Sequence, residues 1–200
     1  PTLSANQVVP NRARQGREDE YKYMSADRIN SMVRHYRSIV EPYVQKMPDS
    51  MNEPLTSSQY DTVAKQLHSE IEQNYRTYQT GFNKPMPFYI GKPTPTNGKL
   101  KLNWDVAYDF NNEDLRYTVT VSKDYEGNDV VFTQNDLVLP EVVIDMPGEG
   151  QYFIKVSVRN ASGETQDAFD YYVTDGNKIY GTKCFYVKAD GSIVEDANVQ

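Results

Sequence analysis

Two alternating segments near the middle of the chain constrain its fold most. Residues 100–104 (LKLNW) and 115–122 (LRYTVTVS) each alternate apolar and polar side chains. A period of two is that of a β-strand with one buried face. Two half-buried strands are not stable alone in water, so they require further strands. We therefore expect a two-sheet fold in the C-terminal half, with Trp104 near the middle of its core.

Further short segments of the C-terminal half supply those strands. We expect them at residues 88–90, 129–134, 141–146, 151–160, 183–188 and 192–195. Turn-forming sequences separate several of them, such as PGEG at 147–150 and Asp190-Gly191. About seven short strands at regular spacing indicate an immunoglobulin-like β-sandwich. Residues 164–181 fit either a turn of helix or an edge strand, with a turn at Asp175-Gly176.

The N-terminal half has the period of helices. Apolar residues recur at spacings of three and four over residues 29–47 and again over residues 60–78. Two amphipathic helices joined by a loop at residues 48–54 predict an antiparallel α-helical hairpin. Two helices bury little apolar surface by themselves, so we expect the rest of that surface to meet the sandwich or an upstream domain.

Local signals set the helix limits. Ser25 fits an N-cap, Thr56–Gln59 fits a capping box, and Gly81 fits a C-cap. Pro42 should kink the first helix or interrupt it. The charged residues 1–24 have no apolar stripe and predict an irregular polar arm.

The predicted fold class is therefore α+β with segregated domains. A polar arm at 1–24 precedes the helical hairpin at 25–82. An all-β immunoglobulin-like sandwich follows at 83–200, with a long insertion at about 161–181.

Charge is unevenly spread along the 200 residues. Residues 1–85 carry 11 Lys/Arg and 10 Asp/Glu, whereas residues 86–200 carry 10 and 18, so +1 and −8 make the total of −7. An acidic sandwich is a poor partner for nucleic acid or for anionic membranes. No run approaches the ~18 apolar residues of a membrane span, so we expect no membrane insertion.

The ends and the cysteine content give further expectations. Cys184 is the only cysteine, so no intrachain disulfide is expected, and its apolar neighbours predict a buried side chain. The chain starts at Pro1 with neither an initiator Met nor a signal peptide. We expect it to be a piece of a larger protein.

The C-terminal half resembles a known fold family. Trp104, Tyr117 and the stretch GEGQYFIKVSVRN at 148–160 carry the likeness, which covers about residues 86–188. In these features the chain resembles fibronectin type III domains. The resemblance implies a fold that hosts many binding roles. The gap of about twenty residues before KCFYVK departs from the family pattern.

The helical half resembles a second family. RINSMVRHYRSIVEPYVQKMP at 28–48 and SSQYDTVAKQLHSEIEQ at 57–73 are similar to the helical tail of the spore-coat H (CotH) kinase-like family. The resemblance implies a secreted or surface bacterial protein, at the cell or spore surface, with a phosphotransferase domain before residue 1. That family's nucleotide- and metal-binding motifs are not in these residues, so it implies no catalytic residue and no cofactor here.

Acidic and amide side chains cluster in the loop between the two central segments. They are Asp105, Asp109, Asn111, Asn112, Glu113 and Asp114. Oxygen ligands of this kind bind calcium, and Asp109, Asn111 and Asp114 are the candidate ligands. The cluster lacks the glycine and terminal Glu of an EF-hand. A solvated turn is the alternative, because Asp and Asn are common turn residues.

Aromatic residues gather in the insertion. Phe169, Tyr171, Tyr172 and Tyr180 lie beside several carboxylates. Such a set can form a sugar platform or a protein-binding surface. The alternative is that the rings fill the end of the sandwich or pack on the helical hairpin.

No residue set specifies an enzyme. His35 and His68 are the only histidines, and both are predicted to be on solvated helix flanks. No nucleophile elbow, P-loop or dinucleotide fingerprint is present. We therefore expect a non-catalytic accessory fragment whose sandwich is a spacer or protein-interaction module. A carbohydrate-binding module that uses the Tyr-rich loops is the alternative, and an enzyme ranks last.

Overall fold

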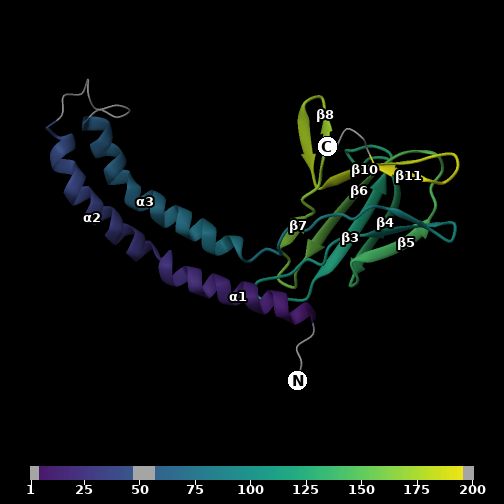
Figure 1. The fold of residues 1–200 in the computed structure, drawn as a ribbon, viewed down its shortest axis with the longest axis horizontal. Coiled ribbons are helices and arrows are strands. Elements are labelled where there is room, and N and C mark those ends of the chain that lie inside the picture. The colour runs from purple at the N-terminus through teal and green to yellow at the C-terminus, as the bar shows by residue number, and fades with distance from the viewer. Residues whose placement is uncertain (1–4, 47–56, 196–200) are drawn as a thin grey trace. The chain divides into compact units, whose positions relative to one another are not determined.

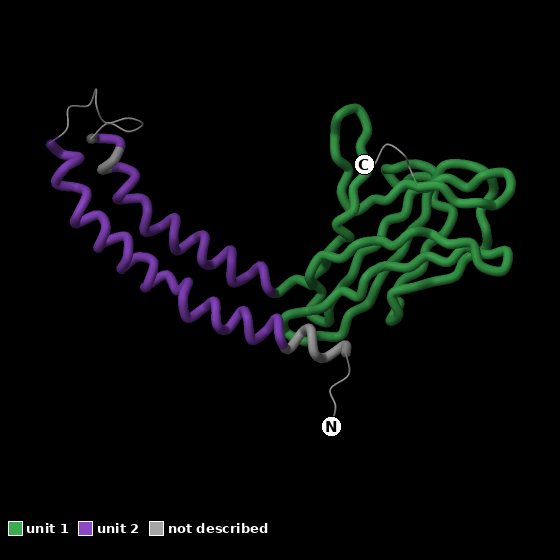
Figure 2. Tube along the Cα trace, viewed as in Figure 1, with its two compact units in different colours: residues 1–10, 83–200 green, residues 11–82 purple. Residues whose placement is uncertain are grey.

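The computed structural model describes residues 5–46 and 57–195. The chain divides into two compact units, residues 11–82 and residues 83–200 together with residues 1–10 (Figure 2). Helices form the first unit in chain order, residues 11–82, which Figure 2 labels unit 2. Antiparallel strands dominate the second, which Figure 2 labels unit 1. The coarse α+β class, with helices and sheets in separate parts of the chain, is thereby confirmed.

Three helices lie in the described N-terminal part. They are α1 (Ala5–Tyr23), α2 (Ala26–Val44) and α3 (Ser57–Gly81). The prediction of an irregular arm at 1–24 is wrong, because α1 occupies nearly all of it. Arg, Gln, Glu and Lys are strong helix formers even without an apolar stripe. Tyr21 adds tertiary support, since its ring packs on residues of α3.

An aromatic cluster joins the end of α1 to the end of α3. The Tyr21 ring lies 5.7 Å from the Tyr78 ring and 5.9 Å from the Phe82 ring, each nearly perpendicular. The Tyr78 hydroxyl donates a hydrogen bond to the Glu20 carboxylate. Partial burial, together with this carboxylate, raises the pKa of Tyr78 to about 12.

Helix α2 begins and ends close to the predicted positions. Ser25 is its N-cap, and the Ser25 hydroxyl accepts a hydrogen bond from the Arg28 amide at 3.3 Å. Pro42 lies in the last turn, and the helix ends two residues later. Figure 1 shows α3 running antiparallel beside α2, as expected for a hairpin. The predicted loop at 48–54 and Thr56 of the capping box lie outside the described residues.

The second unit contains a three-stranded and a six-stranded antiparallel sheet, with a separate two-stranded hairpin. The first sheet has the order β1 (Thr94–Thr96), β2 (Lys99–Asn103) and β5 (Glu141–Asp145). The second has the order β11 (Ile193–Glu195), β10 (Thr182–Val187), β6 (Gly150–Arg159), β3 (Arg116–Ser122) and β4 (Val130–Leu137), with β7 (Thr165–Asp167) also paired to β6. The hairpin consists of β8 (Tyr171–Thr174) and β9 (Asn177–Tyr180).

One apolar core receives side chains from both larger sheets. In the six-stranded sheet Val119 pairs with Val156 and both are buried, which fits the alternating pattern. Leu102 of β2 belongs to the same core. Trp104 is 4% exposed and its ring lies 5.5 Å from that of Tyr117, so its predicted central place is confirmed.

Two tyrosine hydroxyls tie this core to nearby backbone. The Tyr117 hydroxyl accepts a hydrogen bond from the Ala107 amide at 2.8 Å. At the start of β6, the Tyr152 hydroxyl donates to the Gly148 carbonyl at 3.0 Å. Both rings are buried, so each polar tip has found a partner at the core boundary.

The segment before β2 differs from the prediction. Residues 88–90 form no strand and make a single bridge, between Ile90 and Trp104. The first strand is β1, paired with β2 through a two-residue turn at Asn97 and Gly98, where φ is 50° and 75°. Asn-Gly is the preferred sequence for such a turn because both residues tolerate positive φ. Pro95 lies in this edge strand, where its missing donor does no harm.

The predicted insertion at about 161–181 forms strands and no helix. Tyr171 pairs with Tyr180 and Thr174 with Asn177, and the turn lies at Asp175-Gly176 as predicted. The Gly181 amide donates to the Asp170 carbonyl at 2.7 Å and closes the base of this hairpin.

Candidate functional site

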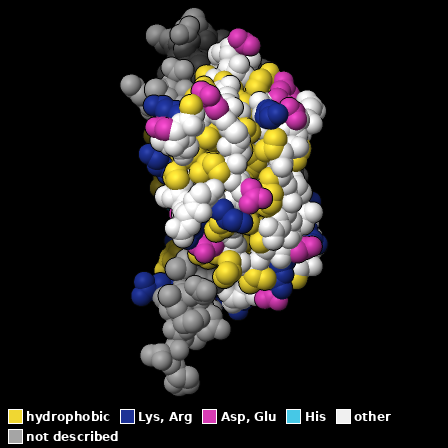
Figure 3. All heavy atoms as spheres, turned by 90° about the vertical axis from the view of Figure 1, so that its right-hand side faces the viewer, with side chains coloured by type: hydrophobic (Ala, Val, Ile, Leu, Met, Phe, Trp, Pro, Cys, Tyr) yellow, Lys and Arg dark blue, Asp and Glu magenta, His cyan; other side chains and the backbone are white. Residues whose placement is uncertain are grey.

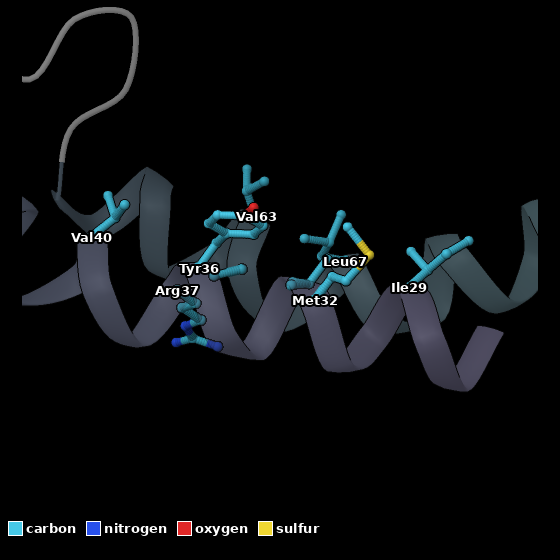
Figure 4. Close-up of a pocket in the computed structure, with 9 residues that line it drawn as sticks. Ile29, Met32, Tyr36, Arg37, Val40, Val63 and Leu67 are labelled. Carbon is cyan, nitrogen blue, oxygen red and sulfur yellow. The ribbon is translucent and has the colours of Figure 1, made fainter. Parts of the chain in front are cut away.

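An apolar groove runs between α2 and α3. It has a volume of about 510 Å³ and is lined by Ile29, Met32, Val33, Tyr36, Arg37, Val40, Val63, Ala64 and Leu67. Figure 4 shows the labelled apolar side chains on one side of the helix pair, while Arg37 points to the other side. The Arg37 guanidinium binds both Glu41 carboxylate oxygens, at 2.9 and 3.2 Å. The groove is therefore almost purely apolar.

The apolar side chains around this groove are largely in water. Met32 is 50% exposed and Tyr36 is 61% exposed. Of the described side chains of α2 only Ala26 and Asn30 are buried, and none of those described on α3 is. A contiguous exposed apolar area marks an interaction surface. We call the exposed apolar residues that line this groove, Met32, Tyr36, Val40 and Val63, the helical apolar face.

The predicted calcium loop is held by an internal network around Asp109. One carboxylate oxygen accepts hydrogen bonds from the Asn111 and Glu113 amides, at 2.7 and 3.3 Å. The other accepts one from the Asn160 side-chain amide at 3.0 Å. Asp109 is buried, whereas Asn111 and Asp114 are exposed. In this arrangement Asp109 serves as the acceptor that shapes the loop.

Asn160 extends the network to two more segments. Its amide nitrogen also donates to the Asn83 carbonyl at 2.9 Å, and its side-chain oxygen accepts from the Glu164 amide at 2.8 Å. In the described residues no group of three His, Cys, Asp or Glu side chains is placed to hold a metal ion. Calcium binding by Asp109, Asn111 and Asp114 stays a prediction.

The four predicted aromatic residues separate into different environments. Tyr171 and Tyr180 form a cross-strand pair with rings 5.8 Å apart, and the Lys178 ammonium lies 4.3 Å from the Tyr171 ring centre. Tyr172 faces the other way, because neighbouring residues of a strand alternate. Its ring packs 5.0 Å from that of Phe153.

Phe169 belongs to a pocket of about 360 Å³ that we call the aromatic pocket. Its lining residues are Tyr89, Phe169, Asp170, Tyr171, Lys183, Cys184 and Glu195. The Phe169 and Tyr89 rings lie 5.7 Å apart and nearly perpendicular. Sequence reasoning missed Tyr89. The run Phe88-Tyr89-Ile90 shows no polar alternation in the sequence, so only the structure shows that Tyr89 faces water between two buried residues.

An ion cluster forms one side of the aromatic pocket. The Lys183 ammonium lies 3.1 Å from a Glu195 oxygen and 3.7 Å from an Asp170 oxygen. It also donates to the Ile90 carbonyl at 2.8 Å. The second Asp170 oxygen accepts a hydrogen bond from the Ile90 amide at 2.7 Å. The cluster thus fixes the insertion to residues 88–90.

The remaining candidate groups are ordinary surface or core residues. His35 and His68 are exposed, as predicted. Cys184 is 4% exposed, which confirms the predicted burial, and its sulfur lies 3.2 Å from the Gln151 amide nitrogen. Within the described helices none is both long and apolar enough to cross a membrane.

Charge is dispersed on the face of the molecule drawn in Figure 3. Lys/Arg and Asp/Glu side chains alternate there with apolar ones, and the described residues of this face form no large area of one sign. No protein-family model matches the chain, and a search of curated proteins also gives no match.

Proposed function

We propose that this chain is a non-catalytic accessory and binding fragment of a larger secreted or surface bacterial protein. In this proposal the helices attach to an upstream domain of the same polypeptide, related to the spore-coat H (CotH) kinase-like family. The second unit is a spacer or protein-interaction module. The observation that carries the proposal is the helical apolar face, because exposed apolar side chains on a helix pair require a partner.

We further propose that the second unit has a fibronectin type III-like fold. Two antiparallel sheets that share one core are typical of this architecture. The Tyr152 hydroxyl returns to the backbone four residues upstream, at the start of β6, as the tyrosine corner of immunoglobulin-like domains does. The β8–β9 hairpin is then an insertion between two strands of that fold.

A pull-down with the separately produced upstream segment tests the attachment. The double variant Met32→Asp, Tyr36→Asp places charges on the helical apolar face and should abolish capture. The matched control is Val138→Asp, Leu139→Asp, because these side chains are 64% and 65% exposed and lie in the second unit. Capture that survives the helix variant, or is lost equally in the control, would contradict the proposal.

The absence of catalysis is tested directly on the same fragment. A phosphotransfer assay with ATP and Mg²⁺ should give no turnover above a buffer blank. Robust turnover by the purified chain would exclude an accessory role.

A carbohydrate-binding module is the second candidate function. The aromatic pocket favours it, because Tyr89 and Phe169 expose about half of their surface beside carboxylates. Aromatic faces with a few polar groups are typical of small-ligand sites.

A further inference from the structure

The aromatic pocket is a built site and not a chance gap between loops. The Phe169 amide donates to the Phe88 carbonyl at 2.8 Å, and the Asp105 amide donates to the Tyr89 carbonyl at 2.9 Å. Both aromatic residues are therefore fixed through their backbones to core segments. Pre-organised groups bind a ligand without a further cost of ordering.

The two aromatic walls present their rings to water. Tyr89 is 55% exposed and Phe169 is 51% exposed, and the rings meet at 79°. Such a corner offers one ring face and one ring edge to the same ligand. A ligand that fits it has at least one apolar face.

The charges of the pocket disfavour an anionic ligand. Lys183 is surrounded by the Ile90 carbonyl and by the carboxylates of Asp170 and Glu195, so its ammonium is already compensated. An anion would meet two carboxylates and an ammonium that they already neutralise. A neutral ligand avoids this conflict.

Hydroxyl-binding groups remain at the rim. Glu195 supplies a partly exposed carboxylate, and Tyr89 and Tyr171 carry phenol groups. Rings with apolar faces and hydroxyl edges match this combination. The pocket volume of about 360 Å³ is at the small end of ligand sites.

We infer that the aromatic pocket binds a neutral saccharide, one or two pyranose rings in length, stacked against Phe169 and Tyr89 with hydroxyls directed to Glu195. This inference rests on the carbohydrate-binding candidate above and assigns its site. Tyr172 takes no part, because its ring packs on Phe153 and Tyr125.

Calorimetric titration of the full chain with defined oligosaccharides tests the inference. The neutral probes are hexasaccharides of glucose, mannose, xylose and N-acetylglucosamine, and oligogalacturonate is the acidic probe. We expect binding of at least one neutral probe. Phe169→Ala and Tyr89→Ala should each weaken it by about tenfold or more. Tyr43→Ala, at a 70% exposed tyrosine of α2, is the control and should not change it.

The possible results distinguish an error in the assigned pocket from an error in the carbohydrate-binding function. Neutral-probe binding that both pocket variants retain overturns the assigned site and leaves the carbohydrate function. Binding of oligogalacturonate alone overturns the neutral class. No binding of any probe overturns the inference and the carbohydrate candidate together, while the accessory role is judged by its own pull-down. Trp104 fluorescence of each variant shows whether the core is intact.

Discussion

Two substitutions in the same core, Tyr117→Phe and Tyr152→Phe, should lower the free energy of unfolding by different amounts. Both remove a single buried hydroxyl, and both hydroxyls make one hydrogen bond to backbone. Tyr117 accepts from the Ala107 amide, which is buried; Tyr152 donates to the Gly148 carbonyl, which belongs to an exposed residue. Burial raises the pKa of Tyr117, which indicates that its hydroxyl lies away from water.

The difference follows from what each substitution leaves behind. Tyr117→Phe leaves the buried Ala107 amide without its hydrogen-bond acceptor, which lowers the free energy of unfolding by about 1–3 kcal/mol. After Tyr152→Phe, water can bind the Gly148 carbonyl, so the loss is the net value of one hydrogen bond, about 0.5–1.5 kcal/mol. We expect Tyr117→Phe to be less stable than Tyr152→Phe by about 1 kcal/mol.

Urea unfolding followed by tryptophan fluorescence measures this difference. Trp104 is the only tryptophan and is buried in the same core, so its signal reports the second unit alone. The slope against urea should be the same for both variants if only stability changes. Equal losses of unfolding free energy, or a larger loss for Tyr152→Phe, would refute the argument from the unpaired Ala107 amide.

Three further predictions concern other parts of the chain. The pKa of Tyr78 is raised to about 12, so the unfolded state loses the hydroxyl proton near pH 10 and the folded state only near pH 12. The stability of the helical unit should therefore fall as the pH rises through this window. Far-UV circular dichroism should show a smaller loss of helix over the same pH range in Tyr78→Phe. Because both Asp109 oxygens already accept protein hydrogen bonds, about 5 mM calcium should leave the melting temperature unchanged, whereas a rise that Asp114→Asn removes would establish a calcium site. Gly98→Ala should cost about 1–2 kcal/mol in urea unfolding, because φ is 75° there while the space for a methyl group is open; an unchanged midpoint would mean that the turn relaxes.

The sequence predicted the elements whose pattern is set by burial. Strands β3 and β6 show mostly alternating burial, broken where Ser122 and Phe153 are buried as well, and the predicted bounds of each lie within about a residue of the observed ones. Helix α1 was missed because the prediction required an apolar stripe, whereas its helicity depends on residue propensity and on the packing of Tyr21. For strand β1 the sequence indicated only that Pro93 and Pro95 fit an edge strand or its exit; the bounds of the strand and its Asn-Gly turn were not predicted.

The candidate sites were predicted less well, because they depend on contacts between distant segments. The sequence identified Phe169 and Tyr171, but their pocket also needs Tyr89, which is 80 residues from Phe169 along the chain. It also grouped Tyr172 with them, although strand alternation turns that ring to the other face. Asp109 was identified as a ligand candidate, and its burial in an amide network could not be seen from spacing.

The bonds between residues 88–90 and 169–170 have a consequence for folding order. The Ile90 amide and the Asp170 carboxylate that accepts its hydrogen bond are 80 positions apart. Closing so long a loop is entropically costly until the intervening strands have paired. During synthesis the segment at 88–90 can pair with Trp104 and Asp105 early, but its bonds to residues 169–170 form only after the ribosome has made the insertion. A nascent chain halted before residue 169 would hold most of the sheet residues and still lack a completed pocket.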